Sequence, residues 1–140
     1  VYRMIYAIDF DGTLVNSQYP YIGEERKLST HMLDKTKIEK FIPATDFCKE
    51  LQRKGHKLIL WTCREGEPLQ EALRWCLYRG LIFDAVNDDL PQVKQCFPDE
   101  LKSWEGSERA RKIHADVYID DKAVVPICED KDKNVRYREF

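Results

Sequence analysis

The sequence predicts an α/β protein in which a central parallel sheet lies between layers of helices. Short apolar runs alternate along most of the chain with segments of helical periodicity, which is the pattern of β-α-β units. The apolar runs are continuous, as in strands that are covered on both faces. Three of these runs end in residues that can carry chemistry.

Four apolar runs are expected to form the strands of the sheet. The first, MIYAI at residues 4–8, ends directly before Asp9. The others lie at residues 57–62, 81–87 and 116–121. The terminal run VRYREF predicts a short final strand at the edge of a sheet.

Helices are expected between the strands. Residues 43–54 have a helical period, because Phe47 and Leu51 are four positions apart, and Gly55 stands where such a helix would end. Further helices are predicted at residues 31–42, 68–79 and 107–114, a loop at 88–106 and a solvated turn at 129–134.

The segment at residues 15–30 predicts a flap, or irregular hairpin, over the end of the first strand. Asn16, Pro20 and Gly23 are turn formers that stand between apolar and aromatic residues. Tyr19 and Tyr21 in this flap would either gate a substrate or pack the flap onto the domain.

Size and composition favour one globular domain over residues 1–140. The net charge of -2 gives no electrostatic basis for a nucleic-acid or membrane partner, and no apolar run is long enough to span a membrane. The five cysteines are odd in number and widely spaced, which argues against a disulfide framework and a thiolate zinc site. We expect a reducing, cytoplasmic compartment, and the sequence leaves open whether the chain is a homo-oligomer.

The residues at the strand ends predict a phosphate-handling metal site. Asp9 and Asp11 follow the first strand, Thr62 ends the second, and Asp120 and Asp121 end the fourth. Parallel sheets bind ligands at the carboxyl ends of their strands. Carboxylates gathered there would repel unless a cation lay between them, and Mg²⁺ prefers such oxygen ligands together with substrate phosphate. A carboxylate could then attack phosphorus and form an aspartyl-phosphate.

The motifs resemble those of the haloacid dehalogenase (HAD) superfamily. The run IYAIDFDGT is similar to its first motif, LILWT to its second and VYIDD to its fourth, in the same order along the chain. The resemblance implies a Rossmann-like fold and a Mg²⁺-dependent phosphomonoester phosphatase that acts on a phosphorylated small molecule. The intervals between the motifs leave no room for the large cap domain of many members.

The same resemblance implies a role for each residue. Asp9 would be the nucleophile, Asp11 the acid and base, and Thr62 a hydrogen-bond donor to the phosphoryl group. The metal ligands would be Asp9, the backbone carbonyl of Asp11 and Asp120, with Asp121 as a supporting or alternative ligand. The family's lysine is best matched by Lys112, with Lys94, Lys102 and Arg109 as alternatives.

The neighbours of these positions complete the expected substrate-binding set, which is Gly12, Thr13, Cys63 and Arg64. Arg64 would contact the substrate anion or lie in solvent, and the Cys63 thiol is expected to be buried. Asn87, Asp88 and Asp89 would form a turn or a further contact at the same edge of the sheet.

Two other functions remain open. A phosphotransferase would use an acceptor hydroxyl in place of water. A non-catalytic module that binds Mg²⁺ and phosphate for regulation would need the metal ligands alone, whereas the acid at Asp11 favours catalysis. The histidines His31, His56 and His114 are too far apart in sequence to indicate a zinc site.

Overall fold

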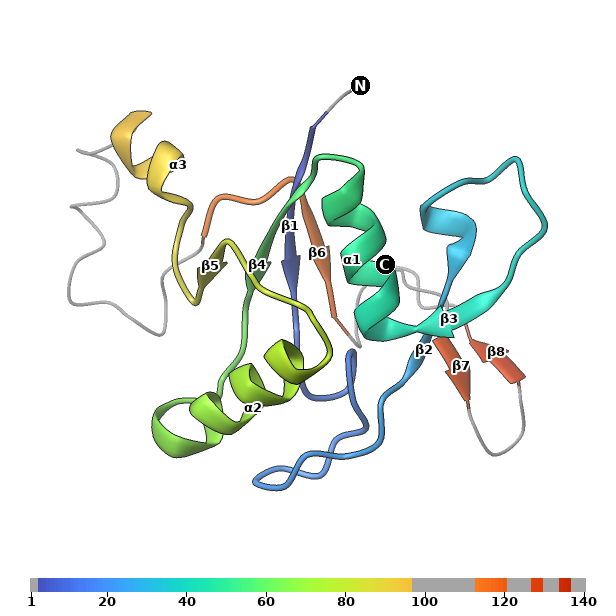
Figure 1. Ribbon diagram of the computed structural model, residues 1–140, viewed down its shortest axis with the longest axis horizontal. Helices are drawn as coiled ribbons and strands as arrows, with labels where there is room; N and C mark the ends of the chain where they lie inside the picture. The colour runs from blue at the N-terminus through green and yellow to red at the C-terminus, as the bar shows by residue number, and fades with distance from the viewer. Residues whose placement is uncertain (1–2, 97–112, 121–126, 130–133, 137–140) are drawn as a thin grey trace.

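The computed structural model describes residues 3–96, 113–120, 127–129 and 134–136, which form two sheets and the helices that pack on them (Figure 1). Its strands are β1 (Ile5–Ile8), β2 (Lys27–Ser29), β3 (Phe41–Pro43), β4 (Lys57–Leu60), β5 (Ala85–Val86), β6 (Val117–Ile119), β7 (Ile127–Glu129) and β8 (Asn134–Arg136). Its helices are α1 (Ala44–Arg53), α2 (Gly66–Tyr78) and α3 (Pro91–Cys96), with one 3-10 turn, η1 (Thr30–Met32). None of these described helices is long and apolar enough to cross a membrane.

The parallel sheet has the strand order β5-β4-β1-β6. β1 therefore lies between β4 and β6 (Figure 1). Ile8 pairs with Leu60 on one side and with Ile119 on the other. Each of these residues is the last of its strand, so the residues that follow them leave the sheet at one common edge. The predicted α/β architecture with a central parallel sheet is confirmed, and it is compatible with a Rossmann-like fold.

Apolar side chains cover both faces of this sheet. Ile8 of β1 belongs to the larger core cluster, to which α1 contributes Phe47 and α2 contributes Cys76. Ala7 faces the opposite side, where Val93 of α3 packs against a smaller cluster. This two-sided burial explains why the strands read as continuous apolar runs and not as alternating ones.

The amino-terminal edge of the parallel sheet is closed by side chains. Asp116 accepts a hydrogen bond from the Ile5 amide at 2.7 Å, and Asp84 accepts one from the Leu58 amide at 2.8 Å. These carboxylates satisfy strand amides that have no strand partner beyond them. The opposite, carboxyl edge is where the candidate site lies.

A second sheet, which the sequence did not predict, is antiparallel and has the order β3-β2-β7-β8. The last part of the flap predicted over residues 15–30 forms its strand β2. β8 lies at the edge of this sheet, so the prediction of a terminal edge strand is confirmed for the part of VRYREF that β8 covers.

The helix predicted over residues 43–54 is confirmed as α1, with one change at its start. Pro43 is extended (ψ 141°) and is the last residue of β3. β3 is an edge strand of the second sheet, and an edge strand tolerates a residue without an N–H. The helix predicted over residues 31–42 is wrong, because that region contains only η1, irregular chain and the start of β3.

Other boundaries also differ from the prediction. Strand structure lasts only where a neighbouring strand pairs with it, so the strands predicted at 57–62, 81–87 and 116–121 shorten to β4, β5 and β6. The helix predicted over 68–79 is α2. The loop predicted over 88–106 contains α3, which Pro91 begins as proline commonly does.

Two predicted segments lie largely outside the described residues. They are the turn at 129–134 and the helix at 107–114, of which only residues 113 and 114 are described, in irregular conformation.

Candidate active site

Asp9 and Asp120 leave the sheet from adjacent strands. They directly follow Ile8 and Ile119, which pair across β1 and β6. The Asp9 amide donates to the Ile119 carbonyl at 2.9 Å, and the Asp9 Oδ1 accepts from the Phe10 amide at 2.9 Å. Both carboxylates are partly exposed. The register of the sheet thus brings to one edge two acids that lie far apart in the sequence, as predicted.

The chain after Asp9 turns sharply beneath the site. The Phe10 carbonyl accepts from the amides of Thr13, Leu14 and Val15 at 3.0–3.3 Å. Gly12 has φ 89°, a conformation that favours glycine, and its amide donates to the Val15 carbonyl at 2.7 Å.

Gly12 and Thr13, both predicted to bind substrate, are buried in this turn. The Gly12 amide is already engaged with Val15. Thr13 is fully buried, and its Oγ1 has no hydrogen-bond partner among the described residues. These two residues therefore shape the turn, and neither presents a polar group at the surface of the site.

Thr62 stands at the end of β4, on the other side of β1 from Asp120. The preceding residue, Trp61, donates its amide to the Ile8 carbonyl at 2.9 Å. The Thr62 Oγ1 accepts from the Arg64 amide at 3.1 Å. Because that bond uses a lone pair, the hydroxyl keeps its own hydrogen to donate to a further acceptor.

Arg64 does not lie in solvent, and this interpretation of the sequence is wrong. Its side chain is only 1% exposed and binds both carboxylate oxygens of Asp11, with Nε–Oδ2 2.7 Å and Nη2–Oδ1 2.8 Å. The guanidinium lies over the rings of Phe10 and Tyr19, each at 5.1 Å from the ring centroid. The hydrogen bonds to Asp11 raise the pKa of Arg64, although burial opposes that rise.

Arg64 also binds three backbone carbonyls. Its Nη2 donates to the Tyr21 carbonyl at 2.9 Å, and its Nη1 donates to those of Pro20 and Pro68 at 3.3 Å each. With the two bonds to Asp11, these account for all five N–H groups of a guanidinium. No N–H of Arg64 is left for a substrate anion in this arrangement.

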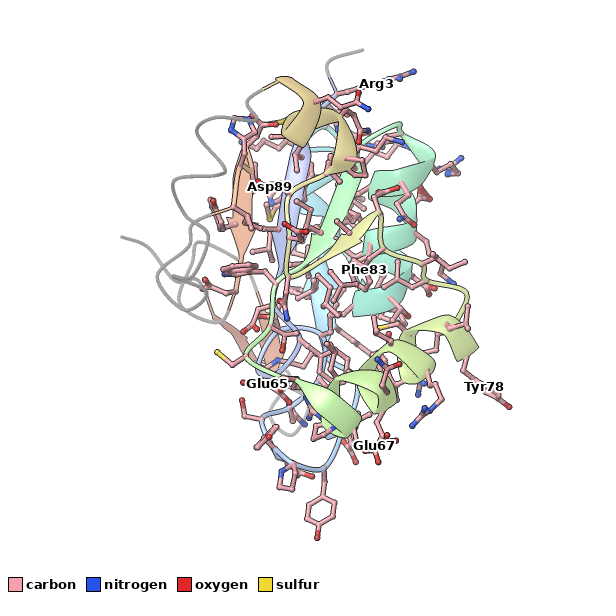
Figure 2. All side chains as sticks on the ribbon, turned by 90° about the vertical axis from the view of Figure 1, so that its left-hand side faces the viewer. Arg3, Glu65, Glu67, Tyr78, Phe83 and Asp89 are labelled. Carbon is pink, nitrogen blue, oxygen red and sulfur yellow. The ribbon has the colours of Figure 1, made fainter. Side chains whose placement is uncertain are left out.

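Cys63 is exposed, so the expectation of a buried thiol at this position is wrong. It lies in the loop between β4 and α2, where the chain has left the sheet. Figure 2 shows Glu65 and Glu67, which flank the start of α2, at the end of the molecule opposite to Arg3. The Cys63 thiol is therefore on the surface at the carboxyl edge of the sheet.

The donors at this edge fit Mg²⁺. Within the described part of the chain, no three His, Cys, Asp or Glu side chains are grouped to hold a metal. Mg²⁺, however, is commonly bound by one or two carboxylates, with water and substrate phosphate completing its shell. Asp9 and Asp120 supply two carboxylates on adjacent strands, whereas the Asp11 carboxylate is bound to Arg64. Asp11 would then contribute its backbone carbonyl, and not its carboxylate, as a metal ligand.

Three of the four candidates for the family's lysine are not tested by this arrangement. Lys102, Arg109, Lys112 and the proposed ligand Asp121 lie outside the described residues. Lys94 belongs to α3, which Figure 1 shows level with the amino-terminal half of β1, away from the site.

Asn87 and Asp89 have structural roles that the sequence only partly indicated. Asn87 has φ 51° and holds the Thr62 amide through its Oδ1 at 2.7 Å. Asp89 is buried, and its Oδ1 accepts from the His114 amide at 2.6 Å. The turn interpretation of residues 87–89 is thus correct for Asn87, which also positions a predicted site residue.

The fold and the strand-end acids define the chain as an α/β protein with a Rossmann-like parallel sheet. It is similar to the solved structure of a conserved protein coded by a locus from Bacteroides thetaiotaomicron, with 41% sequence identity and a TM-score of 0.61. The similarity covers 88% of this chain and 79% of the other. The chain therefore belongs to the same family as that Bacteroides protein. No family model matches the chain, and neither does any curated protein.

Proposed function

We propose that the protein is a Mg²⁺-dependent phosphomonoester phosphatase of the HAD type. The observation that carries this proposal is the placement of Asp9, Thr62 and Asp120 at the carboxyl ends of the three adjacent strands β1, β4 and β6. Ligands of open α/β sheets bind at this edge. The order of the three motifs along the chain, which resembles that of the HAD superfamily, supports the same function.

The proposed reaction has two steps. A carboxylate oxygen of Asp9 attacks phosphorus and the bond to the ester oxygen breaks. Asp11, which at this step carries a proton on a lone pair that Arg64 does not use, gives that proton to the leaving alcohol oxygen. Water then attacks the phosphorus of the aspartyl-phosphate and gives a proton to Asp11. This hydrolysis releases phosphate and restores Asp9. Thr62 would donate to a phosphoryl oxygen throughout.

The metal would be held by Asp9, Asp120 and the Asp11 carbonyl. Bound there, Mg²⁺ would neutralise charge on the phosphoryl oxygens. The substrate would be a phosphorylated small molecule that reaches the site beside the flap. Free thiols at Cys48, Cys63 and Cys76 fit a reducing, cytoplasmic compartment.

The test is phosphate release from an aryl phosphate and a panel of metabolite phosphates, with Mg²⁺ and with chelator. Metal-dependent turnover that is lost in Asp9→Asn supports the proposal, and Asp46→Asn, an exposed carboxylate on α1, is the matched control. Turnover that survives in Asp9→Asn would exclude Asp9 as the nucleophile. Binding of Mg²⁺ and phosphate without turnover would favour a regulatory module, and transfer to an added alcohol would favour a phosphotransferase.

A further inference from the structure

Arg64 connects three segments that meet beside the candidate site. It binds the carboxylate of Asp11 after β1, the carbonyls of Pro20 and Tyr21 in the flap, and the carbonyl of Pro68 in the first turn of α2. A guanidinium can do this because its five N–H groups have a fixed planar geometry. A lysine ammonium has three donors and could not make the same set of bonds.

We infer that Arg64 is a positioning residue that fixes the Asp11 carboxylate and the flap tip, defined as residues 16–24, in one arrangement. The inference rests on the proposed function, in which Asp11 transfers the proton. It assigns Arg64 a role through Asp11 and not through contact with the substrate, because the arginine is 1% exposed and its donors are used.

The contact with Arg64 leaves the Asp11 side chain accessible for the proposed proton transfer. Its side chain is 21% exposed, so it still reaches the surface of the site. Each carboxylate oxygen has two lone-pair directions, and the bond to Arg64 occupies one of them. The bidentate contact thus restricts the rotation of the carboxylate without covering it, which is how a general acid is kept within reach of its target.

The flap tip is set by the same group. Among its side chains, the Tyr19 ring lies against the Arg64 guanidinium. Tyr19 and Tyr21 are 61% and 76% exposed, whereas Ile22 packs against the larger core cluster. The carbonyl bonds from Arg64 to Pro20 and Tyr21 therefore anchor the exposed part of the flap tip, next to the contact that Ile22 makes with the core.

The first test compares alkyl and aryl phosphates in Arg64→Lys. An alkyl leaving group needs a proton in the transition state, whereas a nitrophenolate hardly does, so misplacement of Asp11 should affect the alkyl ester selectively. We expect kcat/KM for the alkyl phosphate to fall about 100-fold and kcat/KM for the aryl phosphate to fall less than about fivefold. The ratio kcat/KM is compared because it reports formation of the aspartyl-phosphate and not its hydrolysis, in which Asp11 acts for both esters. Arg79→Lys is the matched control, because Arg79 also stacks on an aromatic ring, that of Trp75, and pairs with an acid, Glu25.

A double-mutant cycle separates this role from general stability. In an Asp11→Asn background, Arg64→Lys should cause no further change in the alkyl-to-aryl ratio, because the residue through which it acts is already disabled. Equal losses for both esters, or an undiminished effect in the Asp11→Asn background, would overturn the inference while leaving the phosphatase proposal intact. Wild-type protein without metal-dependent turnover would instead overturn the proposed function.

A second measurement does not depend on the folding of Arg64 variants. The asparagine side chain has one acceptor oxygen, whereas the aspartate side chain has two, so Asp11→Asn loses one of the two hydrogen bonds from Arg64. We expect the amides of the flap tip to exchange with deuterium several-fold faster in Asp11→Asn than in Asp9→Asn, which removes the same charge from the other acid. Equal exchange in the two variants would show that Arg64 does not connect Asp11 to the flap tip.

Discussion

The side-chain oxygen of Asn87 accepts a hydrogen bond from the Thr62 amide at 2.7 Å, while the Asn87 amide donates to the Leu60 carbonyl at 2.8 Å. One residue after β5 thereby fixes the chain where it leaves β4. Asn87 does so at φ 51°, in the left-handed region that asparagine tolerates better than most residues.

Substitutions at Asn87 should separate the hydrogen bond from the backbone conformation. Asn87→Asp keeps the acceptor and should change the free energy of unfolding by less than about 0.5 kcal/mol. Asn87→Gly loses only the bond, and Asn87→Ala also adds backbone strain, so we expect alanine to cost about 2 kcal/mol and glycine about half of that. Urea unfolding measures all three. If Asn87→Gly and Asn87→Ala lowered the free energy of unfolding equally, the positive φ at this position would add no backbone strain for alanine.

Glu25 stabilises the start of α1 from outside the helix. The helix has no side-chain cap of its own, because Pro43 precedes it. Glu25 Oε2 instead accepts from the Thr45 amide at 2.9 Å and from the Thr45 hydroxyl at 2.5 Å. Since caps contribute about 1 kcal/mol, Glu25→Ala should lower the free energy of unfolding by about 1–2 kcal/mol in a urea titration. The exposed neighbour Glu24→Ala is the control and should stay within about 0.5 kcal/mol of wild type.

Gly23 allows the flap to fold back on itself. A Cβ at this position would lie 2.4 Å from the Asn16 carbonyl oxygen, which is too close for any side chain. We expect Gly23→Ala to rearrange the flap tip and to lower kcat/KM about tenfold, with a much smaller effect in Ser17→Ala on the same loop. If Gly23→Ala left kcat/KM unchanged, the flap tip would have no part in turnover.

The buried thiols should make stability depend on alkaline pH. Burial raises the pKa of Cys76 from 9.0 to about 12 and also raises that of Cys48. Above pH 9 the unfolded chain loses these protons while the folded chain keeps them, so the free energy of unfolding falls as pH rises, by up to about 1.4 kcal/mol per pH unit for each thiol. Below pH 9 this contribution is fully present.

Urea unfolding between pH 8 and pH 11 measures this effect. Cys76→Ala should have a lower but flatter stability curve than wild type, because one titrating group is gone. Cys63→Ala, at an exposed position, serves as the control for removing a thiol. The thiol argument would be wrong if both variants had the same slope.

The sequence predicted the parallel sheet because its strands carry their own signal. Residues 6–8 of β1 and 58–60 of β4 are buried, so each strand is apolar over these three positions. The acids and Thr62 were located for the same reason, since each stands where such a run ends. The second sheet has no comparable signal, because β2 is three residues long and pairs with residues 127 and 128, about a hundred positions away.

The burial of Arg64 could not be predicted for a related reason. A charged side chain is normally exposed, and its burial here depends on acceptors from Asp11, Pro20, Tyr21 and Pro68 that only the folded chain brings together. Neither the spacing nor the chemistry of these four residues in the sequence indicates a shared partner.

The two ends of the flap are held by contacts with two different sheets. At one end Val15 bridges to Asp11 beside β1, and at the other Lys27 begins β2 of the antiparallel sheet. Insertions or exchanges between these anchors would leave the register of both sheets unchanged. Changes in this short loop would therefore alter the surface beside Asp11 while the strands that position Asp9 and Asp120 remain as they are.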